Sequence, residues 1–215
     1  MTPAPSNAVR KMLREDHLGA STFVEKGWNL IATGDFEAAE AVLVHALELA
    51  PSDARAQALL GWARMRRGMY DEAQELFTNL LAETPCHALA RVNLGYVCLR
   101  KGDLAQASEL LDHSSRQTRD PQATLYACFY LGLLFAAEAN YFGAETCFQK
   151  TVALAPSFIE GYYELGRAQL SAGRLAEARN TWKRGYALNR FNLWGKRCAE
   201  ALRMADRGEQ PVSYS

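Results

Sequence analysis

Five glycines recur along the chain at nearly constant spacing, and this spacing constrains the fold more than any other feature. They are Gly27, Gly61, Gly95, Gly132 and Gly166, separated by 34, 34, 37 and 34 residues. Two further rows follow the same steps: Ala39, Ala73, Ala107, Ala144 and Ala178, and the turn residues Gly34, Gly68, Gly102, Ala139 and Gly173. Three sets of residues that recur with the same spacing indicate five copies of one structural unit.

The first copy shows which structure the unit encodes. From Gly27 it reads GWNLIATGDFEAAEAVLVHALELAPS, with apolar residues at helical spacing before and after the Gly34 turn. Glycine tolerates the left-handed conformation that ends a helix, and the aspartate after it can cap the next helix. Pro51 ends the second helix because proline has no N–H to donate. Each unit is therefore predicted to be two antiparallel helices, whose backbones approach closely at the small residues.

The later copies resemble the tetratricopeptide repeats, a family of 34-residue helix-turn-helix units. They read LGWARMRRGMYDEAQELFTNLLAETP from Leu60, LGYVCLRKGDLAQASELL from Leu94, LGLLFAAEANYFGAETCFQKTVALAP from Leu131 and LGRAQLSAGRLAEARNTWKRGYALNR from Leu165. The resemblance implies an all-α, right-handed superhelical solenoid of five repeats. Their predicted bounds are 20–53, 54–87, 88–124, 125–158 and 159–192.

Both ends of the array are expected to be covered, because solenoid ends need a polar outer side. Residues 1–19 are predicted to form an arm and a helix that covers the first repeat. Residues 193–208 are predicted to form a capping helix, and residues 209–215 a flexible tail. The cap is expected to bury the apolar residues Leu193, Trp194, Ala199, Leu202 and Ala205.

The third copy departs from the pattern at its end. Arg119 stands where the other copies close with proline, and three extra residues follow before the fourth copy. The polar segment HSSRQTRDPQ predicts a lengthened helix and loop near residues 114–122. It is either a hinge or a tolerated insertion, since lengthening a loop costs little.

The resemblance also implies a binding groove lined by the first helix of each repeat. The positions that face it lie three before, one after and four after the repeated glycine. In this sequence they are Val24, Trp28 and Ile31; Ala58, Trp62 and Met65; Val92, Tyr96 and Leu99; Phe129, Leu133 and Ala136; and Tyr163, Arg167 and Leu170. One subfamily places Lys and Asn at the first two positions to clamp a C-terminal carboxylate. Val24 and Trp28 stand there in the first repeat, which disfavours that ligand.

An apolar and aromatic groove favours a non-catalytic scaffold or adaptor that binds another protein. A partner helix or an extended hydrophobic peptide would suit it, with Trp and Tyr as anchors. A narrower interpretation resembles the small tetratricopeptide chaperones of secretion systems, which hold hydrophobic segments. Alternatively, the same side chains fill the space between first helices or are covered by the N-terminal arm.

A second hypothesis rests on charge, although the chain has a formal net charge of zero. Between residues 178 and 199 it has no acidic residue but six basic ones: Arg179, Lys183, Arg184, Arg190, Lys196 and Arg197. Trp182, Tyr186, Phe191 and Trp194 interleave with them. Such a segment could bind an acidic protein, an anionic membrane surface or, less expectedly, single-stranded nucleic acid. The alternative is a solvated convex surface, with Trp182 in the core.

No pattern favours catalysis, a cofactor or a metal. The four histidines are scattered over the repeats, and His45 with Glu48 is expected to be a solvated pair rather than half a metal site. Cys86, Cys98, Cys128, Cys147 and Cys198 form no CxxC pair and are predicted to be reduced thiols of a cytoplasmic protein, with Cys98, Cys128 and Cys147 packed in the interior. No apolar run has the length of a membrane span.

Overall fold

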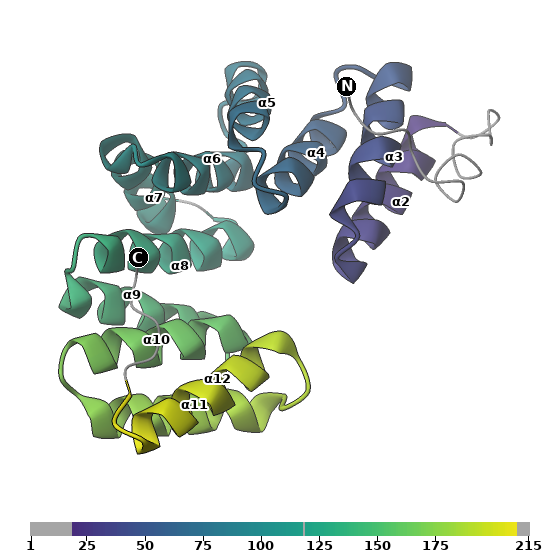
Figure 1. Cartoon of the computed structure of the whole chain (residues 1–215). Helices are drawn as coiled ribbons and strands as arrows, with labels where there is room; N and C mark the ends of the chain where they lie inside the picture. Colours follow the sequence, from purple (N-terminus) through teal and green to yellow (C-terminus); the bar gives the residue numbers. More distant parts are fainter. Residues whose placement is uncertain (1–18, 118, 210–215) are drawn as a thin grey trace. The chain divides into compact units, whose positions relative to one another are not determined.

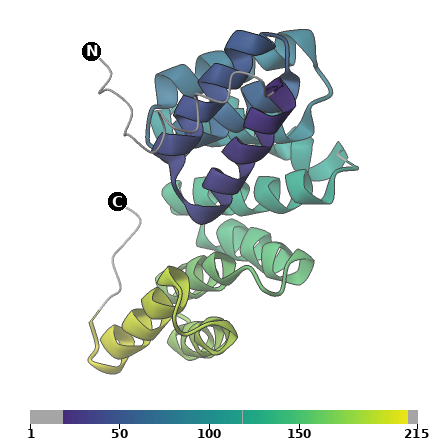
Figure 2. The same ribbon diagram turned by 90° about the vertical axis from the view of Figure 1, so that its right-hand side faces the viewer.

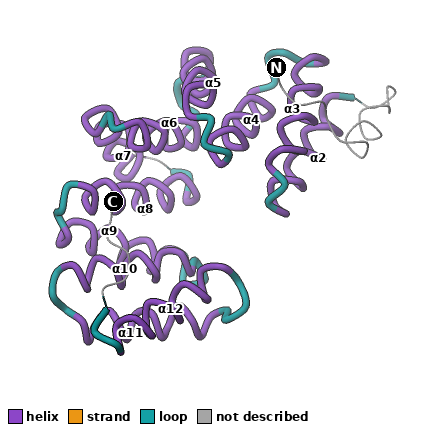
Figure 3. The backbone as a smooth tube through the Cα atoms, in the orientation of Figure 1, coloured by secondary structure: helices purple, strands orange, loops and turns teal. Residues whose placement is uncertain are grey.

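The protein is all-helical in the part of the chain that this computed structural model describes, residues 19–117 and 119–209 (Figure 1). The helices are α2 (Ala20–Thr33), α3 (Phe36–Leu49), α4 (Ala54–Arg66), α5 (Tyr70–Glu83), α6 (Ala88–Lys101), α7 (Leu104–Gln117), α8 (Pro121–Ala137), α9 (Tyr141–Leu154), α10 (Ile159–Ser171), α11 (Leu175–Leu188) and α12 (Leu193–Asp206). No strand occurs among these residues (Figure 3). The predicted N-terminal arm and helix lie almost entirely outside the described residues.

The chain divides into two compact units, residues 1–103 and 104–215, which are described separately. In the first unit, α2 packs with α3 and α4 with α5, while α4 also contacts α2, α3 and α6. In the second unit, α8 packs with α9 and α10 with α11, and α12 contacts both α10 and α11. A second view shows the same stacked helices within each unit (Figure 2). This arrangement confirms the predicted helical repeats, whereas the right-handed superhelical course of the whole array stays a prediction.

Each short turn between paired helices places one residue in the left-handed region. Gly34, Gly68, Gly102 and Gly173 have φ of 84°, 81°, 85° and 79°. At the first turn, the N–H groups of Gly34 and Asp35 donate to the carbonyls of Ile31 and Leu30. In the fourth copy Ala139 takes this position with φ 57°. The turn geometry therefore persists where glycine is missing.

The repeated glycines in the first helices make room for large side chains of the second helices. A Cβ atom built on Gly27 would lie 2.6 Å from Leu43, and one on Gly61 would lie 2.7 Å from Phe77. Gly132 with Phe148 and Gly166 with Trp182 repeat this relation. All four large side chains are fully buried. The close approach predicted from the sequence thus joins a helix backbone to a bulky side chain.

The three extra residues of the third junction lengthen a first helix. The helix α7 has 14 residues, like the other second helices, whereas α8 has 17. Asp120 caps α8, because its side chain accepts hydrogen bonds from the N–H groups of Gln122 and Ala123, and Pro121 begins the helix. The expected lengthened helix is therefore the one that follows the junction. A hinge at this place stays a prediction.

The C-terminal helix α12 packs against the last repeat, but its buried side differs in part from the expected one. Cys198, Ala201 and Ala205 join a core cluster with Trp182, and Trp194 and Leu202 pack partly against it. Leu193 is 60% exposed, so the prediction that it is buried is wrong. Leu193 lies five residues before Cys198, which places it about 140° around the helix from that buried residue.

Candidate protein-binding surface

Most residues that lie three before or four after a repeated glycine are packed between helices. Val24, Ile31, Met65, Val92, Phe129 and Ala136 are each at most 4% exposed. Ala58, Leu99, Tyr163 and Leu170 are partly buried, as is Leu133, which directly follows a repeated glycine. The fully buried members cannot touch a partner while the helices stay in place. For them, the structure fits the alternative in which they fill the space between helices.

In the first unit, the residues that directly follow the repeated glycines are all at least partly accessible. Trp28 on α2 is 39% exposed, and Trp62 on α4 and Tyr96 on α6 are partly buried. The rings of Trp28 and Trp62 lie 6.2 Å apart between centroids, with an interplanar angle of 33°. Because α4 packs against both α2 and α6, the three aromatic residues come from adjacent first helices. We call these three residues the aromatic row.

Two arginines extend the aromatic row by one helical turn. Arg66 follows Trp62 by four residues, and Arg100 follows Tyr96 by four, so each pair lies on one side of its helix. The Arg66 guanidinium lies 5.1 Å from the centroid of Phe36. Arg100 lies 5.2 Å from the ring of Tyr70 and donates a hydrogen bond of 3.0 Å to the Tyr96 hydroxyl. Both arginines are exposed, and stacking fixes where their charges lie.

In the second unit, the residue that follows the last repeated glycine contacts other side chains of that unit. Arg167 stands after the last repeated glycine, its side chain is only 14% exposed, and it donates a 3.1 Å hydrogen bond to Glu164. It also lies 5.7 Å from the ring of Tyr163, whose centroid is 5.6 Å from that of Trp194. Arg197 covers the Trp194 ring at 4.5 Å. Here Arg167 of α10 and Arg197 of α12 lie against aromatic rings of the same two helices.

The fold places the residues of the basic segment, between residues 178 and 199, in different environments. Arg179 forms a 2.9 Å ion pair with Asp206, an acidic residue from beyond the segment. Arg184 stacks on Tyr162 at 5.2 Å and Arg190 on Tyr186 at 5.9 Å, while Lys183 and Lys196 are exposed. Trp182 is fully buried and donates a 3.0 Å hydrogen bond to the carbonyl of Tyr163. Its place in the core agrees with the alternative stated for it.

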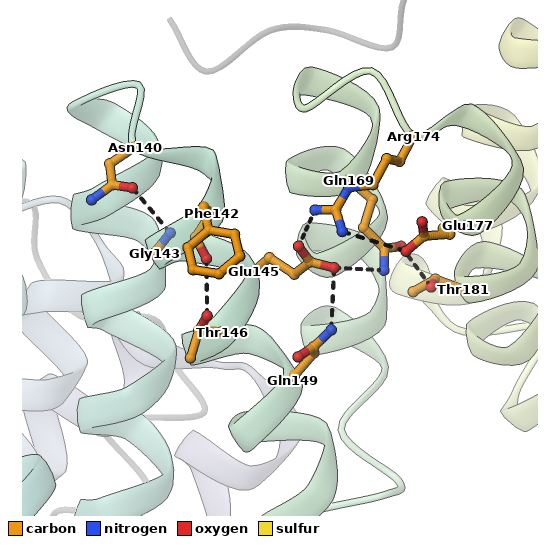
Figure 4. A network of polar contacts seen from close by, with 10 residues as sticks. All are labelled: Asn140, Phe142, Gly143, Glu145, Thr146, Gln149, Gln169, Arg174, Glu177 and Thr181. Atoms are coloured by element: carbon orange, nitrogen blue, oxygen red, sulfur yellow. Dashed lines mark hydrogen bonds and ion pairs between the residues drawn. The ribbon is translucent and has the colours of Figure 1, made fainter.

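A buried polar network joins the fourth and fifth repeats. Figure 4 shows the Glu145 carboxylate between Gln149, Gln169 and Arg174. It accepts hydrogen bonds of 3.1 Å from Gln149 and 3.2 Å from Gln169, and forms an ion pair with Arg174. Gln169 in turn accepts a 2.8 Å hydrogen bond from Thr181. The network ties α9 to α10 and α11.

This network was not predicted, although the repeat contains a signal for it. Glu145 directly follows the repeated Ala144, and Glu40 and Gln74 follow the equivalent alanines. Glu40 pairs with Arg64 and Arg67, and Gln74 accepts a 2.6 Å hydrogen bond from Lys101. In all three cases the polar residue contacts the next repeat. Aligning the copies at this position would have indicated a polar link between repeats.

Four of the five thiols show no sign of activation. Burial raises the pKa of Cys98 and Cys128, raises that of Cys147 to about 11, and raises that of Cys198 to about 12. These thiols are protonated at neutral pH, which disfavours nucleophilic or metal-binding roles. His45 Nδ1 lies 2.9 Å from Glu48 Oε2, with the glutamate exposed. Within residues 19–117 and 119–209, no cluster of three His, Cys, Asp or Glu side chains could hold a metal ion.

Comparison with known proteins identifies the family. Two models, each described as a tetratricopeptide repeat, match residues 64–127 and residues 24–69 together with 130–191. The second alone covers half of the chain, so the protein belongs to the tetratricopeptide repeat family. Members of this family bind other proteins, and their fold is usually non-catalytic. No curated protein matches the chain.

Solved structures agree with the repeat fold. A thermophilic tetratricopeptide repeat protein from Thermus thermophilus is 27% identical, with 86% of this chain and 100% of that one covered and a TM-score of 0.75. PilW, a type IV pilus biogenesis factor, is 23% identical over 87% of each chain, with a TM-score of 0.70. YrrB, which has an unusual peptide-binding site, is 20% identical over 90% of this chain and 98% of its own, with a TM-score of 0.53. The last two similarities show the fold alone.

The described helices give no sign of a membrane span. Within residues 19–117 and 119–209, none combines the length and the hydrophobicity needed to cross a bilayer.

Proposed function

We propose that the chain is a non-catalytic scaffold or adaptor that binds an apolar segment of another protein on its first helices. The segment is helical or extended, and it contacts the aromatic row of Trp28, Trp62 and Tyr96. The observation that carries the proposal is the pair of indole rings, Trp28 and Trp62, on adjacent repeats. Large aromatic side chains of this kind are enriched among residues that dominate binding energy.

Exposure separates Trp28 from the packing residues around it. Trp28 keeps 39% of its surface exposed although Val24 and Ile31 on the same helix are buried. An indole that is half-exposed beside a second indole offers apolar area together with a polar N–H group. A partner would cover this surface at little cost, since the rings are already held by the helices that bear them.

A narrower form of the proposal is a chaperone-like factor of a secretion or assembly system. Its support is the same apolar surface, because such a factor must shield hydrophobic segments from water. We also propose a cytoplasmic location, because none of the five cysteines forms a disulfide.

A second candidate function is the binding of an anionic partner by the basic segment. It is favoured by Phe191, which is 81% exposed between α11 and α12 and directly follows Arg190. An exposed ring beside a cation suits an acidic protein or an anionic surface. The pairing of Arg179 with Asp206 weakens this candidate relative to the first.

Selection of peptides from a displayed library against the full chain tests the main proposal. Peptides with apolar anchors should be enriched, and Trp28→Ala with Trp62→Ala should raise their Kd about 30-fold, as expected for losing about 2 kcal/mol. Phe142→Ala with Phe191→Ala is the matched control, because both rings are exposed and neither lies on a first helix. Circular dichroism checks that the variants stay helical.

The proposal would be contradicted by selected peptides whose affinity is unchanged in the tryptophan variant but falls in the control variant. Trp28→Ala alone guards against misfolding, because Trp28 is the more exposed of the pair.

A further inference from the structure

Charge is sorted by helix from α3 to α6, although the chain as a whole is formally neutral. Every charged residue of α4 and α6 is basic: Arg55, Arg64, Arg66, Arg91, Arg100 and Lys101. Every Asp, Glu, Lys or Arg of α3 and α5 is acidic: Glu37, Glu40, Glu48, Asp71, Glu72, Glu75 and Glu83. The helices that bear Trp62 and Tyr96 therefore carry positive charge, and the second helices carry negative charge.

Several of these cations already have carboxylate partners. Arg55 pairs with Glu25, Arg64 lies 2.9 Å from Glu40, and Lys101 lies 2.6 Å from Asp71. These ion pairs connect neighbouring repeats, so their charge is neutralised inside the unit. Arg91 instead donates a hydrogen bond to the carbonyl of Pro85.

Arg66 and Arg100 are different from these four. Within residues 19–117 and 119–209, neither guanidinium pairs with a carboxylate. They occupy equivalent positions 34 residues apart, and each stacks on the first residue of the preceding second helix, Phe36 or Tyr70. The N–H groups at the guanidinium edge can still bind an acceptor while the ring supports the guanidinium. The repeat thus presents two fixed cations, each one turn beyond an aromatic residue.

We propose that the first helices of this unit bind an acidic amphipathic segment of another protein. Its apolar side chains contact Trp28, Trp62 and Tyr96, and its carboxylates pair with Arg66 and Arg100. This proposal rests on the proposed function and adds the charge of the partner. Charge complementarity carries the proposal. The two guanidinium groups lie beside an apolar surface and have no carboxylate partner among the described residues. The other charges on their helices are also basic.

Residues 1–18 and 210–215 do not supply such a segment. Residues 1–18 contain Arg10, Lys11 and Arg14 against Glu15 and Asp16, and residues 210–215 contain no charged side chain. Nucleic acid is a poorer match, because a polyanion favours a net basic protein, whereas this chain is neutral and α3 and α5 add only negative charge. An acidic polypeptide segment outside residues 1–215 is therefore the occupant that this surface favours.

Three labelled peptides of equal length test the proposal with the full chain. They share the same leucine and alanine positions and carry Glu, Gln or Lys at all others. By fluorescence anisotropy at low salt, the Glu peptide should bind about tenfold tighter than the Gln peptide, as two surface ion pairs would provide. This advantage should shrink as salt rises.

Arg66→Gln with Arg100→Gln should abolish the advantage of the Glu peptide while leaving the affinity of the Gln peptide unchanged. Arg66→Lys with Arg100→Lys keeps the charges and should retain part of the advantage. The matched control is Arg184→Gln with Arg190→Gln, because these arginines also stack on tyrosines but lie in the basic segment. This control should retain the full advantage.

Equal binding of the Glu and Gln peptides would overturn the acidic partner and leave the proposed function standing. Binding of none of the three would overturn both. An advantage that survives Arg66→Gln with Arg100→Gln, or that only the control removes, would also overturn the assignment. So would stronger binding of an oligothymidine strand than of the Glu peptide. Sedimentation that shows self-association dependent on Arg66 and Arg100 would instead identify a second copy as the occupant.

Discussion

The indole of Trp182 occupies the space beside Gly166 so closely that a Cβ atom on residue 166 would lie 2.2 Å from its Nε1 atom. Trp182 is fully buried, and that nitrogen donates to the carbonyl of Tyr163. The glycine, the buried ring and the hydrogen bond therefore depend on one another.

Gly166→Ala should destabilise the protein by about 3 kcal/mol, because overpacking a rigid ring forces backbone and side chains apart. Chemical denaturation measures the loss. In a Trp182→Ala background the same substitution should cost much less, because the obstructing ring is gone. Equal costs in both backgrounds would contradict the relation between the two residues.

Ala139→Gly should stabilise the protein by about 0.5–1 kcal/mol, since Ala139 has a positive φ that glycine adopts without strain. The reverse change at an equivalent turn, Gly173→Ala, should destabilise it by a similar amount. Thermal unfolding of the two variants checks both signs. A decrease in Tm for Ala139→Gly would show that this turn does not require the left-handed conformation.

Glu145→Ala should lower stability by about 2 kcal/mol, mainly because the buried amide of Gln169 loses its acceptor. Glu177→Ala is the control, because Glu177 contacts the same Arg174 from an exposed position at 3.5 Å. Denaturant titration should show a clear loss for the first variant and little change for the second. Similar losses in both would mean that the buried hydrogen bonds contribute little.

The helical repeat was predictable because its signals are local and recur five times. Gly34 and the capping Asp35 define a turn whichever repeat surrounds them, and Trp182 was placed in the core by its repeat position. The sorting of charge was also present in the sequence. Summing charge over the whole chain gives zero, whereas summing it helix by helix separates α4 from α5.

The candidate surface was harder to predict, because one turn of a first helix offers several neighbouring positions. Val24, Trp28 and Ile31 were all assigned to the groove, yet only Trp28 is exposed. Which of them is covered depends on how closely the next repeat approaches, a distance that no local pattern encodes. Leu193 shows the same limit, since its helix was predicted but its orientation was not.

Thiol labelling should distinguish the cysteines by burial. At pH 8 a maleimide should modify the exposed Cys86 rapidly, whereas Cys98, Cys128 and Cys198 should react only after unfolding. The raised pKa of Cys198, about 12, keeps its reactive thiolate scarce at this pH. Mass spectrometry counts the labels, and Cys86→Ala is the control. Rapid labelling of Cys198 in the folded chain would show that α12 detaches readily.

Removing residues 193–215 should cause self-association or aggregation. The deletion takes away α12 and uncovers the cluster that contains Ile159, Ala178 and Trp182, so an apolar surface becomes exposed at the end of the array. A shorter deletion of residues 210–215 serves as the control, because it leaves α12 in place. Sedimentation measures the association and thermal unfolding the stability. A chain without α12 that stays monomeric and equally stable would mean that this helix does not act as a cap.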